Sequence, residues 1–162
     1  MSAVVAPLHP DLVPIAPLLG TWRGRGRGAF PTIERFSYGE QMTFTHVGDP
    51  FLVYEQHSWL LDDGAPLHLE RGFLRPDEAG RLELALAHPL GLTEIAHGAL
   101  TDGVLELATE LGGVGHTRTG MAVVALHRRY ELDGDTLRYT LDMATEATAM
   151  TRHLEAELRR QV

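Results

Sequence analysis

The sequence of 162 residues contains no cysteine. Disulfide bonds, cysteine zinc sites, iron–sulfur clusters and thiol catalysis are therefore excluded, and the absence is typical of a reducing compartment. No apolar run approaches the roughly 18 residues that a membrane helix needs. The stretch from Met1 to Pro10 lacks the basic and apolar regions of a signal peptide. We therefore expect a soluble, cytoplasmic protein.

Positive charge and aromatic side chains are also scarce. The 14 Lys and Arg residues are outnumbered by 22 Asp and Glu residues, which gives a formal net charge of −8. This balance argues against a nucleic-acid partner and against electrostatic attachment to a membrane. Hydrophobic residues make up 44% of the chain and aromatic residues only 7%. The chain can therefore build a core, but it has few large rings with which to fill a wide interior.

Short segments of alternating apolar and polar residues run through most of the chain. The pairs Asp63-Gly64, Asp102-Gly103 and Asp133-Gly134 separate some of them and are strong hairpin signals. The last segment has high helix propensity, but its alternation favours a strand. We predict an all-β, ten-stranded antiparallel up-and-down barrel of the lipocalin or fatty-acid-binding type, since closure removes the sheet edges. The predicted strands cover residues 21–29, 36–46, 51–60, 67–74, 81–87, 92–99, 104–111, 121–132, 136–143 and 153–160.

A proline-rich segment precedes the first predicted strand. Pro10, Pro14 and Pro17 forbid a long helix between residues 8 and 19. A short helical turn remains, and we expect its apolar side to plug one end of the barrel. Residues 1–17 are then an N-terminal extension of a single domain that covers residues 1–162.

Glycines alternate on the first strand. Gly20, Trp22, Gly24 and Gly26 share one face of it. Glycine weakens a strand unless the strand bends or another body lies close against it. Two interpretations follow: a barrel corner with a packed tryptophan, or the floor of a cavity that admits a large planar ligand.

Among the residue types that can take part in chemistry, histidine is overrepresented, with nine copies. His153 begins the last predicted strand, where it is either an exposed group or the single protein ligand of a metal cofactor. Another group, His57, His68 and His88, lies on neighbouring predicted strands, but the spacing of these residues is not a metal-binding signature.

Several motifs resemble those of the nitrobindins, a family of haem-binding β-barrels also called peroxynitrite isomerases. The first is Gly20-Thr-Trp22-Arg-Gly24-Arg-Gly26, which is followed by Phe30-Pro31-Thr32-Ile33. The second is the terminal run Met150-Thr151-Arg152-His153-Leu154. Together with matches between them, the resemblance covers the chain from about Leu18 to its C-terminus.

The resemblance implies a function for specific residues. It predicts one ferric haem b per subunit at one mouth of the barrel, with His153 as the axial iron ligand and Thr32 against the haem. Gly20, Trp22, Gly24 and Gly26 are expected to contribute to the cofactor pocket. Met121 departs from the family, since some members have a lysine there beside the haem. The implied activity is isomerisation of peroxynitrite to nitrate, together with nitric oxide binding. The sequence leaves open whether the protein forms a homodimer.

Two other functions compete with this hypothesis. The Gly-X-Trp start and the barrel also suit a carrier of a small hydrophobic ligand, of the lipocalin or fatty-acid-binding type. A barrel that has lost its cofactor and binds only a partner protein is the third hypothesis, and the presence of His153 and Thr32 argues against it.

Overall fold

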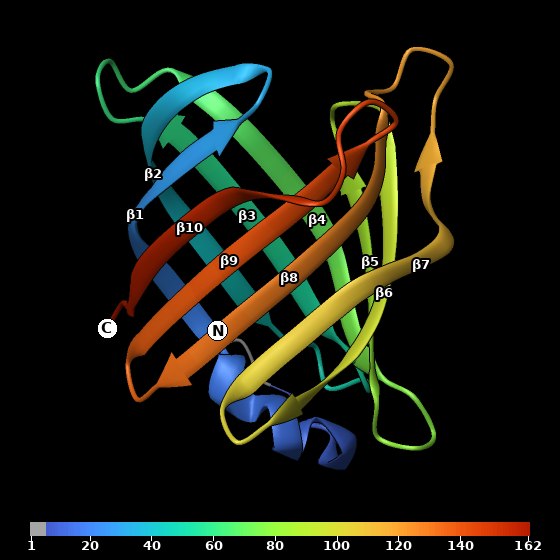
Figure 1. The fold of residues 1–162 in the computed structure, drawn as a ribbon. Helices are drawn as coiled ribbons and strands as arrows, with labels where there is room; N and C mark the ends of the chain where they lie inside the picture. The colour runs from blue at the N-terminus through green and yellow to red at the C-terminus, as the bar shows by residue number, and fades with distance from the viewer. Residues whose placement is uncertain (1–5) are drawn as a thin grey trace.

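The computed structural model describes residues 6–162, in which ten strands form one closed antiparallel barrel (Figure 1). Each strand pairs with its neighbours along the chain, and β10 pairs with β1 to complete the circle. This confirms the predicted architecture, including a strand for the last segment. The strands are β1 (Gly20–Phe30), β2 (Ile33–Thr45), β3 (Leu52–Leu60), β4 (Pro66–Pro76), β5 (Leu82–His88), β6 (Leu92–Thr101), β7 (Val104–His116), β8 (Val123–Asp133), β9 (Thr136–Thr145) and β10 (Thr151–Arg160).

A short helix plugs one end of the barrel, as predicted (Figure 1). The element η1 (Pro10–Leu18) is a 3-10 helix with Pro14 and Pro17 inside it. Its side chains Leu12, Ile15 and Leu18 are buried and belong to the core of the barrel. No helix in the described residues is long and apolar enough to cross a membrane.

Trp22 and Arg160 fasten this helix to the barrel. The indole Nε1 of Trp22 donates a hydrogen bond to the carbonyl oxygen of Leu18, at 2.8 Å. The Arg160 guanidinium lies over the Trp22 ring, 4.2 Å from its centroid, and donates to the carbonyl oxygens of Leu19 and Pro17. These contacts close one end, so a ligand can enter only at the other end or through the wall.

The glycines of β1 allow close contacts within the barrel wall. A Cβ atom at Gly24 would collide with the carbonyl oxygen of Glu157 on β10. A Cβ atom at Gly26 would meet the ring of Tyr38 from β2. Gly20 has a positive φ of 127° and lies against the Arg160 side chain. Of the two interpretations of this strand, the structure favours the bend and the close approach, because protein atoms fill the space above each glycine.

We predict that Gly24→Ala destabilises the fold by about 2 kcal/mol or more, since the backbone of β10 must move to admit the new methyl group. Urea unfolding followed by tryptophan fluorescence measures the change. Gly64→Ala is the control: Gly64 has open space around it but a φ of 74°, so only backbone strain of about 1 kcal/mol is expected. Equal costs for the two variants would contradict the close approach.

Candidate functional site

A cavity of about 540 Å³ opens at the end of the barrel opposite η1. Several of the side chains at its rim are apolar and exposed: Ile33, Leu67, Leu90 and Met121. The volume falls within the range of small-molecule sites. An apolar rim around a preformed cavity favours a ligand with a large hydrophobic surface.

His153 lies at this rim because β10 has an irregular start. The register of β10 against β9 shifts between Arg152 and Leu154, which leaves His153 as an extra residue. In a regular strand successive side chains point to opposite faces, but here His153 and Leu154 both line the cavity. A bulge of this kind turns a side chain toward a site.

Hydrogen bonding fixes the tautomer of His153. Its Nδ1 atom lies 2.9 Å from the carbonyl oxygen of Ala29, which can only accept, so Nδ1 carries the hydrogen. The Phe30 and Phe36 rings meet the imidazole edge-on, with centroids 5.7 Å and 6.4 Å away. Burial lowers the pKa of His153, and the hydrogen bond to Ala29 only partly opposes this. The result is a neutral imidazole with the lone pair of Nε2 free, which is the form that binds a metal ion.

A layer of buried polar side chains lies inside the barrel below the rim. Arg128 from β8 holds Glu70 from β4, with Nη1–Oε1 and Nη2–Oε2 distances of 2.7 Å and 3.1 Å. It also holds Glu94 from β6, with Nε–Oε1 and Nη2–Oε2 distances of 2.8 Å and 2.7 Å. Tyr54 donates a further hydrogen bond to Glu70, at 2.7 Å. One guanidinium therefore links three strands across the lumen.

The charges of this layer are mutually stabilised. Burial by itself would raise the pKa of Glu70 and of Glu94, but Arg128, together with His68 beside Glu70 and His88 beside Glu94, holds both pKa values below the ordinary range. Because the guanidinium stays protonated under all ordinary conditions, both carboxylates are ionised at neutral pH. Removing one member would leave an unpaired buried charge, which is strongly destabilising.

Glu40 is a buried acid of a different kind. Its Oε2 atom accepts a hydrogen bond of 2.7 Å from Gln56, but its Oε1 atom has no partner among the described residues. Burial raises the pKa of Glu40 to about 7, and the hydrogen bond from Gln56 only partly offsets this. Nearby, the hydroxyl groups of Tyr38 and Tyr139 lie 2.6 Å apart.

The predicted site residues lie in three different places. His153 and Met121 line the cavity. Thr32 lies at the same end, exposed in the turn between β1 and β2, and is not among the residues that line it. Trp22 and Gly20 lie at the closed end, and Gly24 and Gly26 form part of the wall, so none of these four lines the cavity.

His57, His68 and His88, which the sequence places on neighbouring strands, divide in the same way. His68 and His88 line the cavity, with 3.2 Å between Nε2 of the first and Nδ1 of the second. His57 lies between Gln56 and Ser58, which both line the cavity. Its side chain therefore points to the outside of the barrel, so the three histidines do not meet.

Sequence reasoning missed the polar layer itself. The signal was present for some members, which stand among the inward apolar positions of their strands. Glu94, for example, stands between Leu92 and Ala96, which are both buried. The missed residues are Glu40, Gln56, Glu70, Glu94 and Arg128.

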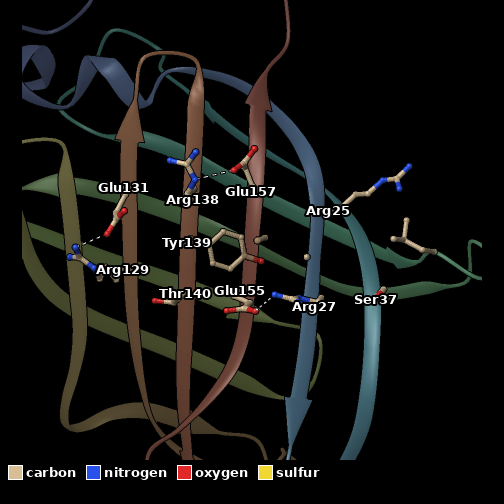
Figure 2. A pocket seen from close by; sticks show the side chains of 13 residues that line it. Arg25, Arg27, Ser37, Arg129, Glu131, Arg138, Tyr139, Thr140, Glu155 and Glu157 are labelled. Carbon is tan, nitrogen blue, oxygen red and sulfur yellow. Dashed lines mark hydrogen bonds and ion pairs between the residues drawn. The ribbon is translucent and has the colours of Figure 1, made fainter.

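A second hollow, of about 570 Å³, lies on the outer face of the wall rather than inside it. Figure 2 shows charged side chains from β1, β8, β9 and β10 around it. Many of them are paired, as in Arg27–Glu155 at 2.7 Å, Arg138–Glu157 at 2.9 Å and Arg129–Glu131 at 2.6 Å. Exposed pairs of this kind contribute little stability.

We predict that Glu40→Gln stabilises the protein at high pH but not at low pH. The pKa of Glu40 is about 7 in the folded state and 4.5 ordinarily, so folding binds a proton between these values and stability falls as the pH rises. The loss is complete above pH 7 and reaches at most about 3 kcal/mol. Glutamine stays neutral and avoids it.

The measurement is urea unfolding of both proteins at pH 5 and pH 8. We expect the variant to be more stable by about 1–3 kcal/mol at pH 8, and the difference to nearly vanish at pH 5. Glu78→Gln, in an exposed turn, is the control and should show no such pH dependence. An advantage of the variant that is larger at pH 5 would refute the assignment.

Comparison with known proteins agrees with this geometry. The family model described as "THAP4-like, heme-binding beta-barrel domain" matches residues 11–160. The chain is 50% identical to peroxynitrite isomerase 2 of Mycobacterium avium, with 95% of this chain and 97% of the relative covered. It is 47% identical to peroxynitrite isomerase of Nocardia farcinica, with 99% of both chains covered.

A solved structure gives the same result. The crystal structure of Rv2717c from M. tuberculosis superposes with a TM-score of 0.89 at 45% sequence identity, and covers 96% of this chain and 100% of its own. Sequence and structure thus agree over nearly the whole length, and the resemblance suggested by the motifs is confirmed. The chain belongs to the THAP4-like, haem-binding β-barrel family, the nitrobindins.

Proposed function

We propose that this chain binds haem b at the open mouth of the barrel through His153 and isomerises peroxynitrite to nitrate, with nitric oxide as a further ligand of the same site. The observation that carries the proposal is the state of His153: a neutral imidazole, held by Ala29, whose free Nε2 atom belongs to a cavity with an apolar rim. Relatives at 47–50% identity are named peroxynitrite isomerases.

The residues present fit a haem. The imidazole is in the tautomer that ligates iron, and its other nitrogen has the backbone acceptor that metal-bound histidines usually have. The apolar side chains Ile33, Leu67, Leu90 and Met121 at the rim are exposed in the protein alone. A large apolar macrocycle would cover them and thereby gain the free energy of their burial.

The haem and the protein side chains would contribute different parts of the reaction. A ferric haem held by His153 would supply a Lewis-acidic iron for the rearrangement of peroxynitrite to nitrate. The protein fixes the His153 ring through Ala29, Phe30 and Phe36, and so holds the ligand atom in one orientation. Its apolar rim excludes water, and the cavity confines small reactants next to the site. The rearrangement conserves all atoms and needs no proton from a side chain.

The rim also offers partners for the polar edge of a haem. The family resemblance leads us to expect a lysine at the position of Met121, and methionine cannot supply that cation. Arg35 lines the cavity, is exposed and has no ion-pair partner within the described residues. We infer that Arg35 pairs with a haem propionate in this chain, and that the Thr32 hydroxyl in the adjacent turn contacts the haem.

A carrier of fatty acids is less compatible with this interior. Carriers of that kind need a cation free to receive a carboxylate head group. Arg128 is the buried cation of the described cavity, and Glu70 and Glu94 already hold it with four hydrogen bonds of 2.7–3.1 Å. An apolar ligand with a neutral head group would still fit the volume.

The decisive test of the proposal is His153→Ala. Mixed with hemin, the wild-type chain should bind one haem and show a Soret band, while the variant should bind at least about tenfold more weakly because the iron loses its protein ligand. Stopped-flow decay of peroxynitrite, with nitrate as the measured product, should slow in the variant to the rate of free hemin.

His57→Ala serves as the control, since His57 points away from the cavity, and it should match the wild type in both assays. The proposal fails if the wild type takes up no haem, or if the spectrum of His153→Ala is unchanged. A protein that instead binds a hydrophobic fluorophore, and releases it to lipids regardless of residue 153, would be a carrier.

For Arg35→Gln we predict a smaller effect. An exposed ion pair is worth up to about 1 kcal/mol, so haem should dissociate no more than about fivefold faster, with an unchanged Soret maximum. Transfer of haem to apomyoglobin measures the rate, and high salt should abolish the difference because it screens the pair. Arg25→Gln on the outer wall is the matched control. An equal effect of both variants would contradict a specific contact at Arg35.

A further inference from the structure

Three potential metal ligands meet inside the cavity, apart from His153. His68 and Glu70 lie on β4 two residues apart, so both point into the lumen. His88 ends β5; the preceding Ala87 pairs with Arg71, which places His88 across from Glu70. The three side chains offer one donor atom each: Nε2 of His68, Oε2 of Glu70 and Nδ1 of His88.

These three atoms form a nearly equilateral triangle. The distance from His68 Nε2 to His88 Nδ1 is 3.2 Å, and Glu70 Oε2 lies 3.4 Å from each of them. Zinc binds histidine nitrogen and carboxylate oxygen at about 2.0–2.2 Å. In a tetrahedron with bonds of this length the ligand atoms are about 3.3–3.6 Å apart, so the triangle already has nearly the size of one tetrahedral face.

An independent contact sets the tautomer of His88. Its Nε2 atom lies 3.0 Å from Oε2 of Glu94, a carboxylate that also accepts from Arg128. Since the carboxylate accepts, Nε2 carries the hydrogen and the lone pair of Nδ1 points toward the other two donor atoms. A carboxylate behind a histidine in this way is the usual support of a zinc-bound imidazole.

The charges of the surroundings also favour a cation. Glu70 and Glu94 bring two negative charges, and Arg128 brings one positive charge, all buried. A divalent ion would offset the remaining negative charge at a place where the carboxylates are already desolvated. The side chain of His68 is 24% exposed, which leaves a path from the open mouth.

We propose that His68, Glu70 and His88 form a second metal site, which takes a divalent transition metal such as zinc and is separate from the haem site at His153. The set of two histidines and one carboxylate leaves a fourth position open toward the cavity, as in catalytic rather than structural zinc sites. The two sites have no ligand in common, although His68, Glu70, His88 and His153 all line the same cavity. Glu94 is a positioning residue in it.

The experiment is to incubate the full chain with zinc chloride, with and without prior loading with hemin, and to measure zinc after gel filtration by elemental analysis. We expect about one zinc per chain in both states, since iron and zinc are counted separately. Calorimetric titration gives the affinity. A chain that retains no zinc overturns the proposal, whatever its behaviour toward haem.

Substitutions of single residues test which side chains bind the zinc ion. His68→Ala and His88→Ala should each abolish stoichiometric binding, and Glu94→Gln should weaken it by about 10–100-fold. His57→Ala and His153→Ala are the matched controls and should retain the metal, which separates this site from the haem site. If His88→Ala does not fold, His68→Ala decides alone, because His68 is partly exposed and makes no hydrogen bond to the Arg128 guanidinium. Zinc bound equally well by His68→Ala overturns the assignment.

Discussion

The first and last strands of this chain hydrogen-bond to each other, and this closure creates both the wall and the site. The pairing is tight because Gly24 has no side chain between its backbone and that of Glu157. The ladder ends at Gly28 and Leu154. The next pair across is Ala29 and His153, whose carbonyl oxygen and imidazole then bond to each other. Without the closure, neither the lumen nor the orientation of His153 would exist.

The interior is arranged in layers along the barrel axis. Leu12, Ile15 and Leu18 of η1 form an apolar plug at one end, and an apolar rim surrounds the mouth at the other. Between them lies the polar layer around Arg128. Burial of these charges is costly, and an apolar replacement would stabilise a barrel at least as well. A polar layer directly below an open cavity therefore indicates a functional role beyond stability. The family membership and the proposed metal site are both consistent with such a functional role.

His153 and His88 are held in different neutral tautomers, and the hydrogen-bond acceptor beside each ring determines which tautomer forms. The carbonyl oxygen of Ala29 takes the hydrogen of His153 Nδ1 and leaves Nε2 free at the mouth. Glu94 takes the hydrogen of His88 Nε2 and leaves Nδ1 free in the lumen. In each case the neighbour decides which nitrogen can bind a metal. His57 contacts neither the Ala29 carbonyl oxygen nor the Glu94 carboxylate. Because it lies on the outer face of the barrel, it belongs to neither site.

Local patterns in the sequence predict the ten strands, their antiparallel order and the helical plug, because alternation, Asp-Gly turns and prolines act over short distances. The motifs also determined the family and singled out His153. The tertiary structure was needed to show what the glycines of β1 do, since the groups that fill their space come from β2 and β10. It likewise decided that Glu70 and Arg128 meet although 58 residues separate them. Contacts across a barrel depend on closure and on the tilt of its strands, and no local pattern encodes them.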